Sequence, residues 1–194
     1  MNHARVDGFW RARRPALLLV LGLVLVSLPV LAGRIVLLTG YTEQVGGMHQ
    51  LNADIQYDLG SDALDALENG LPLRLTVEVE IIRPRAWWPD ATVHELEKVF
   101  EIQYQPLTRL YVIRDLAEGG QESFQSHSAA MARLSRIEDL PIIAADELDQ
   151  DSSYEIRMRA RVDIREYPAG LGLIARLWSD SRVSSGWYQW TLQS

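Results

Sequence analysis

An alternation of apolar and polar side chains over residues 72–114 constrains the fold more than any other feature of this sequence. In its first run, Arg, Thr and Glu residues separate five apolar residues: Leu73, Leu75, Val77, Val79 and Ile81. The side chains of a β-strand point alternately to opposite faces, so this period of two predicts a strand with one apolar and one charged face. The span as a whole predicts three strands joined by two turns.

The second run of this span is amphipathic like the first, with one interruption. Lys98 stands on a face that is otherwise apolar, and the polar face is rich in Glu. The apolar residues are Leu96, Phe100, Ile102 and Tyr104, and the polar residues are Glu95, Glu97, Glu101 and Gln103. A turn at residues 105–108 leads into the third run, 109–114, and Gly119-Gly120 predicts a turn that pairs residues 122–124 with that run.

The clearest strand outside this span covers residues 154–164, and its polar face is basic, with Arg157, Arg159 and Arg161. The polar faces of the first two runs are acidic. We therefore expect this strand to lie beside one of the acidic strands, where opposite charges across strands contribute about 0.2–1 kcal/mol per pair. Three further strands are predicted: residues 35–38 before a turn at Gly46-Gly47, residues 51–59, and a closing strand at residues 187–192.

Two short segments have helical spacing. Ser61 can cap a helix that ends before Gly70, because Gly is favoured just past a helix end. Apolar side chains at three-and-four spacing predict a second helix over residues 128–137, ended by Pro141. Two segments have weaker signals, a helical turn at 144–148 and a short helix or loop at 171–178.

About seven strands and two short helices predict a mainly β fold. We expect a β-sandwich-like, immunoglobulin-like antiparallel domain that follows an N-terminal apolar helix. An α+β sheet with helices on one face is the alternative. About 160 residues follow the N-terminal segment, which is enough for one domain with its own core.

Residues 1–33 have the features of an export segment. Four Arg and one Asp precede the uncharged residues 15–33, whose length is close to the roughly 20 residues that a spanning helix needs. Small residues ending at Ala32 fit a signal-peptidase site instead. The segment is therefore either a cleaved signal peptide or an anchor in the cytoplasmic membrane. Both place residues 34–194 in the cell envelope, on the periplasmic side of that membrane.

Composition excludes several kinds of partner and site. The sequence has no Cys, which excludes disulfides, thiolate metal sites and cysteine nucleophiles. The net charge is −7, and the residues after the first 33 hold 15 basic and 25 acidic side chains, a charge of −10. Nucleic acid and anionic lipid require basic faces, so neither is the expected main partner.

No catalytic, cofactor or metal motif is found. The four histidines (His3, His49, His94 and His127) lack the i, i+4 partner of a helical zinc motif. Residues 149–153 resemble the start of a calcium loop but lack its Gly and its final Glu, and predict a solvated turn. We therefore expect no catalytic residue, metal or cofactor. A hydrolase that uses paired carboxylates is the remaining enzymatic alternative.

The turn between the first two strands holds the candidate interaction residues. They are Arg83, Arg85, Trp87, Trp88 and Asp90. Trp faces stack readily and attract cations, so the turn can form an exposed binding platform. In the favoured interpretation, both Trp side chains instead cap the end of the sandwich core and Asp90 fixes the turn. The same packing is expected for Trp187 and Trp190.

Several motifs resemble an uncharacterised bacterial family, domain of unknown function 4390. The family's ALxxGxPL pattern is met at residues 66–73, and its Arg-x-Arg-aromatic-aromatic-Trp-x-Asp pattern is met at 83–90, except that Ala86 replaces an aromatic residue. Its Tyr-x-x-Leu-Thr-Arg pattern is met at 104–109, and a late Leu-Asp…Pro pattern is met in part by Asp163 and Pro168. The resemblance implies an export segment followed by one β-rich domain. It implies no known activity, but gene neighbours of the family include a membrane sensor kinase of the nitrogen-regulation type.

Together these features predict a non-catalytic envelope protein that acts through protein–protein contact, with a membrane sensor kinase as one conceivable partner. A small-ligand-binding module with a pocket near Trp87 and Trp88 is the alternative. If residues 15–33 stay uncleaved, the cytoplasmic membrane is a further partner.

Overall fold

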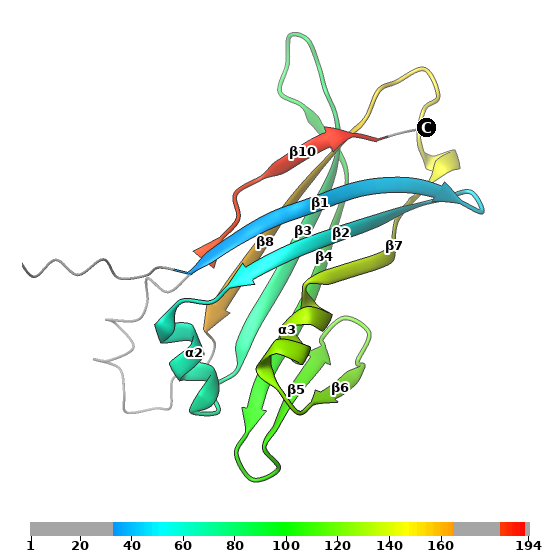
Figure 1. Ribbon diagram of the computed structural model, residues 1–194. Helices are drawn as coiled ribbons and strands as arrows, with labels where there is room; N and C mark the ends of the chain where they lie inside the picture. The colour runs from blue at the N-terminus through cyan, green and yellow to red at the C-terminus, as the bar shows by residue number, and fades with distance from the viewer. Residues whose placement is uncertain (1–32, 165–182, 193–194) are drawn as a thin grey trace, which may run out of the picture. The chain divides into compact units, whose positions relative to one another are not determined.

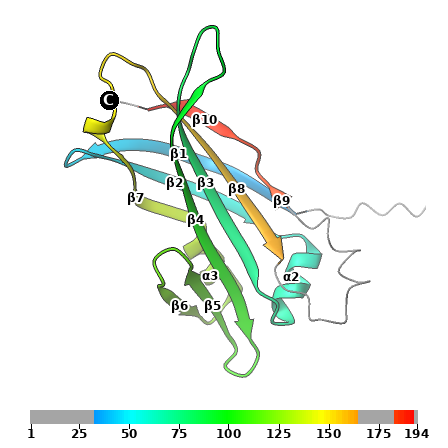
Figure 2. The same ribbon diagram turned by 180° about the vertical axis from the view of Figure 1, so that it is seen from behind.

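The computed structural model describes residues 33–164 and 183–192, and these form two antiparallel sheets with two short helices (Figures 1 and 2). The smaller sheet has the order β1-β2-β7: β1 (Arg34–Val45), β2 (Met48–Asp58) and β7 (Arg136–Ala144). The larger sheet has the order β10-β8-β3-β4-β5-β6, with β9 also paired to β8: β3 (Leu73–Arg83), β4 (Ala91–Gln105), β5 (Leu110–Asp115), β6 (Gln121–Phe124), β8 (Glu155–Ile164), β9 (Val183–Ser184) and β10 (Tyr188–Thr191). The helical elements are α2 (Ser61–Glu68), α3 (His127–Leu134) and the 3-10 turn Ala145–Glu147.

The three strands predicted over residues 72–114 are confirmed as β3, β4 and β5. Leu75 of β3 lies between Phe100 of β4 and Val162 of β8, so the apolar faces of three neighbouring strands coincide. β6 pairs back onto β5, as the Gly119-Gly120 turn predicts. The period of two therefore predicts both the strands and the side of the sheet that is buried.

The charge argument for the basic strand is also confirmed, because β8 pairs with β3. Arg159 lies opposite Glu78 and Arg157 lies opposite Glu80. Nε of Arg159 donates to a Glu78 carboxylate oxygen at 2.7 Å, and Arg161 also donates to that carboxylate. Opposite charges thus meet across the strand pair on its outer face.

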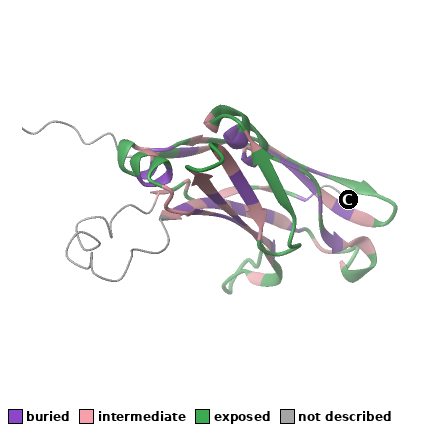
Figure 3. Cartoon of the chain, turned by 90° about the horizontal axis from the view of Figure 1, so that it is seen from below, coloured by how far each residue is buried: buried purple, intermediate pink, exposed green. Residues whose placement is uncertain are grey.

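The core lies between the two sheets, and the helices contribute to it. Buried side chains of both sheets form one cluster with Ala66 and Leu67 of α2 and with Ala130, Met131 and Leu134 of α3. Each fully buried aliphatic side chain contributes roughly 1.5–3 kcal/mol. Figure 3 shows this burial along the strands and exposure at the turns. The fold is thus the predicted mainly β, sandwich-like antiparallel arrangement with two short helices rather than the α+β alternative.

The first helix agrees with its prediction except at its start. Gly60, not Ser61, occupies the N-cap position, and the Ser61 hydroxyl donates to the neighbouring Asp62 carboxylate. Gly70 follows the helix with φ +81°, a left-handed conformation that Gly adopts without steric cost. The prediction that Gly70 follows the helix end is therefore confirmed, and the predicted N-cap residue is wrong by one position.

The second helix is shorter than predicted. Ser126 accepts a hydrogen bond from the backbone N–H of Ala129, and α3 ends at Leu134 because the Ser135 carbonyl turns to the N–H of Ile55 in β2. Ile137 and Pro141, predicted as the helix end and its terminator, both lie on β7. Pro141 is tolerated there because β7 is an edge strand with one neighbour.

The other turns agree with the sequence. Gly46 and Gly47 both have positive φ, as a two-residue β-hairpin requires, and they join β1 to β2. The Asp149 carboxylate accepts hydrogen bonds from the N–H of Asp151 and the hydroxyl of Ser152, which is a self-contained turn. The predicted N-terminal apolar helix and residues 171–178 lie outside the described residues. Among the described residues, no helix is long and apolar enough to cross a membrane.

Candidate functional site

The β3–β4 hairpin ends in an exposed pair of indoles, which we call the Trp tip (residues 83–90). Trp87 is 92% exposed and Trp88 is 76% exposed. The prediction that both cap the sandwich core is therefore wrong. The exposure has a local cause, because the hairpin extends past the smaller sheet (Figure 1). The start of β4 is exposed as well, from Thr92 to Glu95. Within residues 33–164 and 183–192, no second layer of the fold covers the two rings.

The base of the Trp tip is held to the larger sheet by an ion pair. Nη2 of Arg157 donates to the Asp90 carboxylate at 2.6 Å, and Nε of Arg157 donates to Gln189 of β10 at 3.0 Å. Asp90 therefore fixes the turn, as predicted, through a strand 67 residues further along the chain. Arg83 is half-buried at the end of β3, and Arg85 is exposed. The five predicted residues thus share one hairpin, with Arg85 available next to the indoles.

The C-terminal Trp residues lie in a different environment. Trp190 packs against the core cluster, and its ring lies next to Gly40 of β1, where an added Cβ would be 3.2 Å from it. Trp187 is 41% exposed, and the Arg159 guanidinium stacks 4.3 Å from its ring centre. The packing prediction is therefore confirmed for Trp190 and met in part by Trp187.

The Trp tip and the start of the domain lie at opposite ends of β3. Gly33 lies so close to the backbone at Gly60 that a Cβ would be 2.6 Å from the Gly60 nitrogen, and α2 follows directly. β3 begins next to this helix and runs 11 residues to the tip. At about 3.4 Å per residue, the two ends are separated by roughly 35 Å.

A second feature is a cavity of about 340 Å³ between β4 and β5 on one side and β7 on the other, which we call the Lys98 cavity. It is lined by Lys98, Phe100, Asp115, Glu118, Arg133, Arg136, Ile137, Glu138, Asp139, Leu140 and Pro141. Lys98 is the residue that interrupts the apolar face of β4, and its side chain is 13% exposed. Sequence reasoning noticed this interruption but did not assign a site to it.

The charge of Lys98 is balanced by two carboxylates. Its Nζ lies 2.8 Å from Asp115 and also contacts Glu118. Burial opposes the charged ammonium, but the hydrogen bonds and charges of these carboxylates outweigh it and raise the pKa of Lys98. Burial also opposes ionised Asp115, yet Lys98 and the N–H groups of Ala117 and Glu118 lower the pKa of Asp115. Both groups are thus charged at neutral pH.

The opposite wall of the Lys98 cavity is a β-bulge. The register of β7 on β2 shifts between Leu51 and Ala53, and Asp139 has φ +51°. The side-chain oxygen of Asn52 accepts the N–H of Asp139 at 3.1 Å, and this holds the bulge. Bulges often redirect side chains next to functional sites. No sequence signal marks this one.

The outer face of the larger sheet holds an open groove of about 540 Å³. Glu78 lies opposite Glu97, and Glu80 lies opposite Glu95. Arg161 lines the same groove. Like charges directly across strands destabilise a sheet, and the two Arg contacts to Glu78 offset part of this repulsion.

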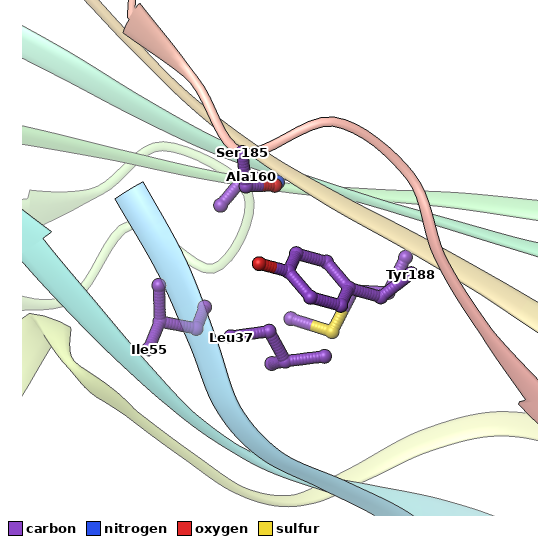
Figure 4. A pocket seen from close by; sticks show the side chains of 6 residues that line it. Leu37, Ile55, Ala160, Ser185 and Tyr188 are labelled. Carbon is purple, nitrogen blue, oxygen red and sulfur yellow. The ribbon is translucent and has the colours of Figure 1, made fainter. Parts of the chain in front are cut away.

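A third space lies inside the sandwich and has no room for a water molecule. In Figure 4, the ring of Tyr188 reaches between Leu37 and Ile55 of the smaller sheet, Ala160 of the larger one, and Ser185 between β9 and β10. This space is a packing gap of the core and not a ligand site.

The histidines are dispersed in the described part of the chain. His49 is buried in β2 and His127 begins α3, and burial lowers the pKa of both. His94 is exposed on β4, and His3 lies outside the described residues. Within residues 33–164 and 183–192, no group of three or more His, Asp or Glu side chains is placed to hold a metal ion.

Comparison with known proteins agrees with the motif resemblance. No curated protein and no solved structure matches the chain. The model of one family, described as a domain of unknown function (DUF4390), matches residues 39–191, which include all of the strands except the start of β1. The chain therefore belongs to the DUF4390 family.

Proposed function

We propose that this protein is a non-catalytic domain of the cell envelope that acts by binding another protein through its Trp tip. The observation that carries the proposal is the exposure of Trp87 and Trp88 on a hairpin whose base is held by the Asp90–Arg157 ion pair. A held hairpin presents the indoles in one place, so little order is lost when a partner covers them.

The composition of the Trp tip supports a protein partner. Trp and Arg are the residue types most enriched among the side chains that dominate binding energy at protein interfaces. Trp87, Trp88 and Arg85 are exposed together, whereas a single exposed apolar residue needs no explanation. A partner with an apolar pocket bordered by carboxylates would complement the two indoles and the Arg side chain.

The position of the Trp tip favours a protein over the bilayer that residues 15–33 would enter. Those residues join the domain at Gly33, beside α2, and the tip lies at the other end of β3. An anchor would therefore tether the domain by the end opposite the Trp tip. The proposed occupant of that end is a second envelope protein, and the membrane sensor kinase that the family resemblance implies is a candidate.

Co-purification from membranes tests the proposal. The full chain with Trp87→Ser and Trp88→Ser is compared with wild type and with Leu107→Ser, which removes a fully exposed apolar side chain from the β4–β5 turn. We expect one envelope protein, identified by mass spectrometry, to be retained by wild type and Leu107→Ser and lost from the tip variant. Equal retention by all three would contradict the proposal.

The location of the domain has its own test. An alkaline phosphatase reporter fused after Ser194 is active only outside the cytoplasm, and we expect activity. The N-terminus of the mature protein then distinguishes a signal peptide from an anchor: a start at Gly33 shows cleavage, and a start at Met1 shows retention. A full-length fusion protein without phosphatase activity would contradict the envelope location.

A further inference from the structure

We propose that the Lys98 cavity binds a small molecule that carries one carboxylate on an apolar body, with the carboxylate on Lys98. This site is separate from the Trp tip and does not depend on the proposed protein contact. Residues of β4, β5 and β7 line the cavity, and the exposed side chain of Glu118 lines it too.

The two acceptors of Lys98 are held unequally. The Asp115 carboxylate accepts the N–H groups of Ala117 and Glu118 at 2.9 and 3.0 Å and is 15% exposed, so it is fixed. The Glu118 side chain is 72% exposed, and ordering an exposed ion pair of this kind contributes little free energy. A ligand carboxylate can therefore replace Glu118 on the ammonium while Asp115 stays in place.

Apolar side chains complete the site. Phe100, Ile137 and Leu140 line the cavity and are themselves buried, so they form an apolar wall next to the charged group. Clefts of about 300–1,000 Å³ with apolar walls and a few converging polar groups are typical of small-ligand sites. The cavity volume of about 340 Å³ is at the small end of this range. Seven of the eleven lining residues are charged, so a compact aryl or short alkyl body would pack on this one apolar wall.

The charges of the lining favour a monoanion. Lys98, Arg133 and Arg136 face a set of four carboxylates: Asp115, Glu118, Glu138 and Asp139. Arg133 is engaged by Glu122 at 2.9 Å, and Arg136 lies 3.7 Å from both Asp54 and Glu138. A ligand with several negative charges would meet more carboxylates than free cations. One carboxylate that takes the place of Glu118 keeps two carboxylates on the Lys98 ammonium.

The bulge of β7 shows that this wall is built with some strain. A non-Gly residue at φ +51° is uncommon, and Asp139 is held there by Asn52. The bulge places Glu138 and Asp139 at the cavity. A regular strand would have paired these residues with β2 instead, so the departure from regularity occurs where the cavity forms.

The sequence allows an unusually clean test, because Lys98 is its only lysine. Full-length protein labelled with ¹³C at the lysine ε-carbon gives one side-chain resonance, which is titrated with phenylacetate. Benzyl alcohol and phenethylamine, which have the same ring without a carboxylate, are the matched controls. We expect a saturable shift with phenylacetate alone and a Kd of about 1 mM or lower, which about ten non-hydrogen atoms reach at ordinary ligand efficiency.

Two variants identify the position of the carboxylate. Glu118→Gln replaces the competing carboxylate by a neutral amide and should tighten phenylacetate binding several-fold, whereas Glu97→Gln on the outer face should leave the Kd unchanged. Saturation transfer to the phenylacetate protons should be lost in Lys98→Met, and a cooperative thermal transition of that variant shows that it is folded. No saturable shift, an equal shift with benzyl alcohol, or unchanged binding in Glu118→Gln would overturn the proposal.

Discussion

The two pairs of tryptophans differ in their environments although both lie next to strand ends of the same sheet. At the C-terminus, Trp190 packs on the core and Trp187 stacks on Arg159. In the β3–β4 hairpin, Trp87 and Trp88 have 92% and 76% of their surface exposed. The difference shows that the position of a strand end, not the residue type, decides whether an indole contributes to stability.

The electrostatic contacts around the two pairs differ in the same way. Arg159 is shared between the Trp187 ring and the Glu78 carboxylate, so it joins an aromatic side chain to the sheet. Arg157 instead holds Asp90 at the base of the hairpin and makes no described contact with either exposed indole. We infer that one Arg covers part of a half-exposed Trp and the other positions an exposed pair.

The largest expected effect on stability is at Trp190, which packs on the core. Trp190→Ala should lower the free energy of unfolding by about 3 kcal/mol, because it removes a large ring from the edge of the core. Urea denaturation of the folded domain measures this change. A loss below about 1 kcal/mol would show that Trp190 is not packed as described, and the contrast between the pairs would fail.

The next effect concerns the Arg–Glu contacts beside Trp187. Glu78→Gln removes the charge that two Arg side chains share and should cost about 1.5 kcal/mol, because hydrogen bonds to charged groups are stronger than neutral ones. It should also raise acrylamide quenching of Trp187 as Arg159 loses its position. Glu97→Gln is the matched control: it lies opposite Glu78 and should be neutral or slightly stabilising.

A smaller loss of stability is expected when Arg157, which holds the base of the hairpin, is replaced. Arg157→Gln should cost only about 0.5 kcal/mol, because the pair is partly exposed. It should nevertheless increase the mobility of the Trp tip, seen as faster hydrogen exchange over residues 84–90. Unchanged exchange in this loop would show that the Asp90–Arg157 pair does not hold the tip.

The smallest stability effect is expected at the tip itself. Trp87→Ser and Trp88→Ser together should change the free energy of unfolding by less than about 0.5 kcal/mol, as for surface substitutions in general. A destabilisation comparable with that of Trp190→Ala would show that the tip packs against the domain. That result would support the interpretation that Trp87 and Trp88 cap the sandwich core.

Much of the fold could be predicted because alternation is a local property. The apolar face of β3 and the basic face of β8 were readable from single runs, and their opposite charges predicted the pairing of distant strands. The end of α3 could not be predicted, because Ser135 turns toward Ile55, a contact across 80 residues. Ile137 and Leu134 have helical spacing in the sequence but lie on different elements.

The candidate sites were predictable only in part. The residues of the Trp tip could be named from their composition, but their exposure depends on how far the smaller sheet extends under the hairpin. Lys98 was visible as an interruption, whereas its partners Asp115 and Glu118 lie on and after a neighbouring strand. The bulge at Asp139 has no local signal, since Asn52 imposes it from β2.

Site-specific photo-crosslinking in living cells tests the central claim most directly. A photoreactive amino acid at position 88 is compared with one at position 107, a fully exposed site on the turn at the other end of β4. We predict a discrete adduct with one envelope protein from position 88 and none from position 107. The same adducts from both positions, or adducts with lipid alone from position 88, would contradict the account.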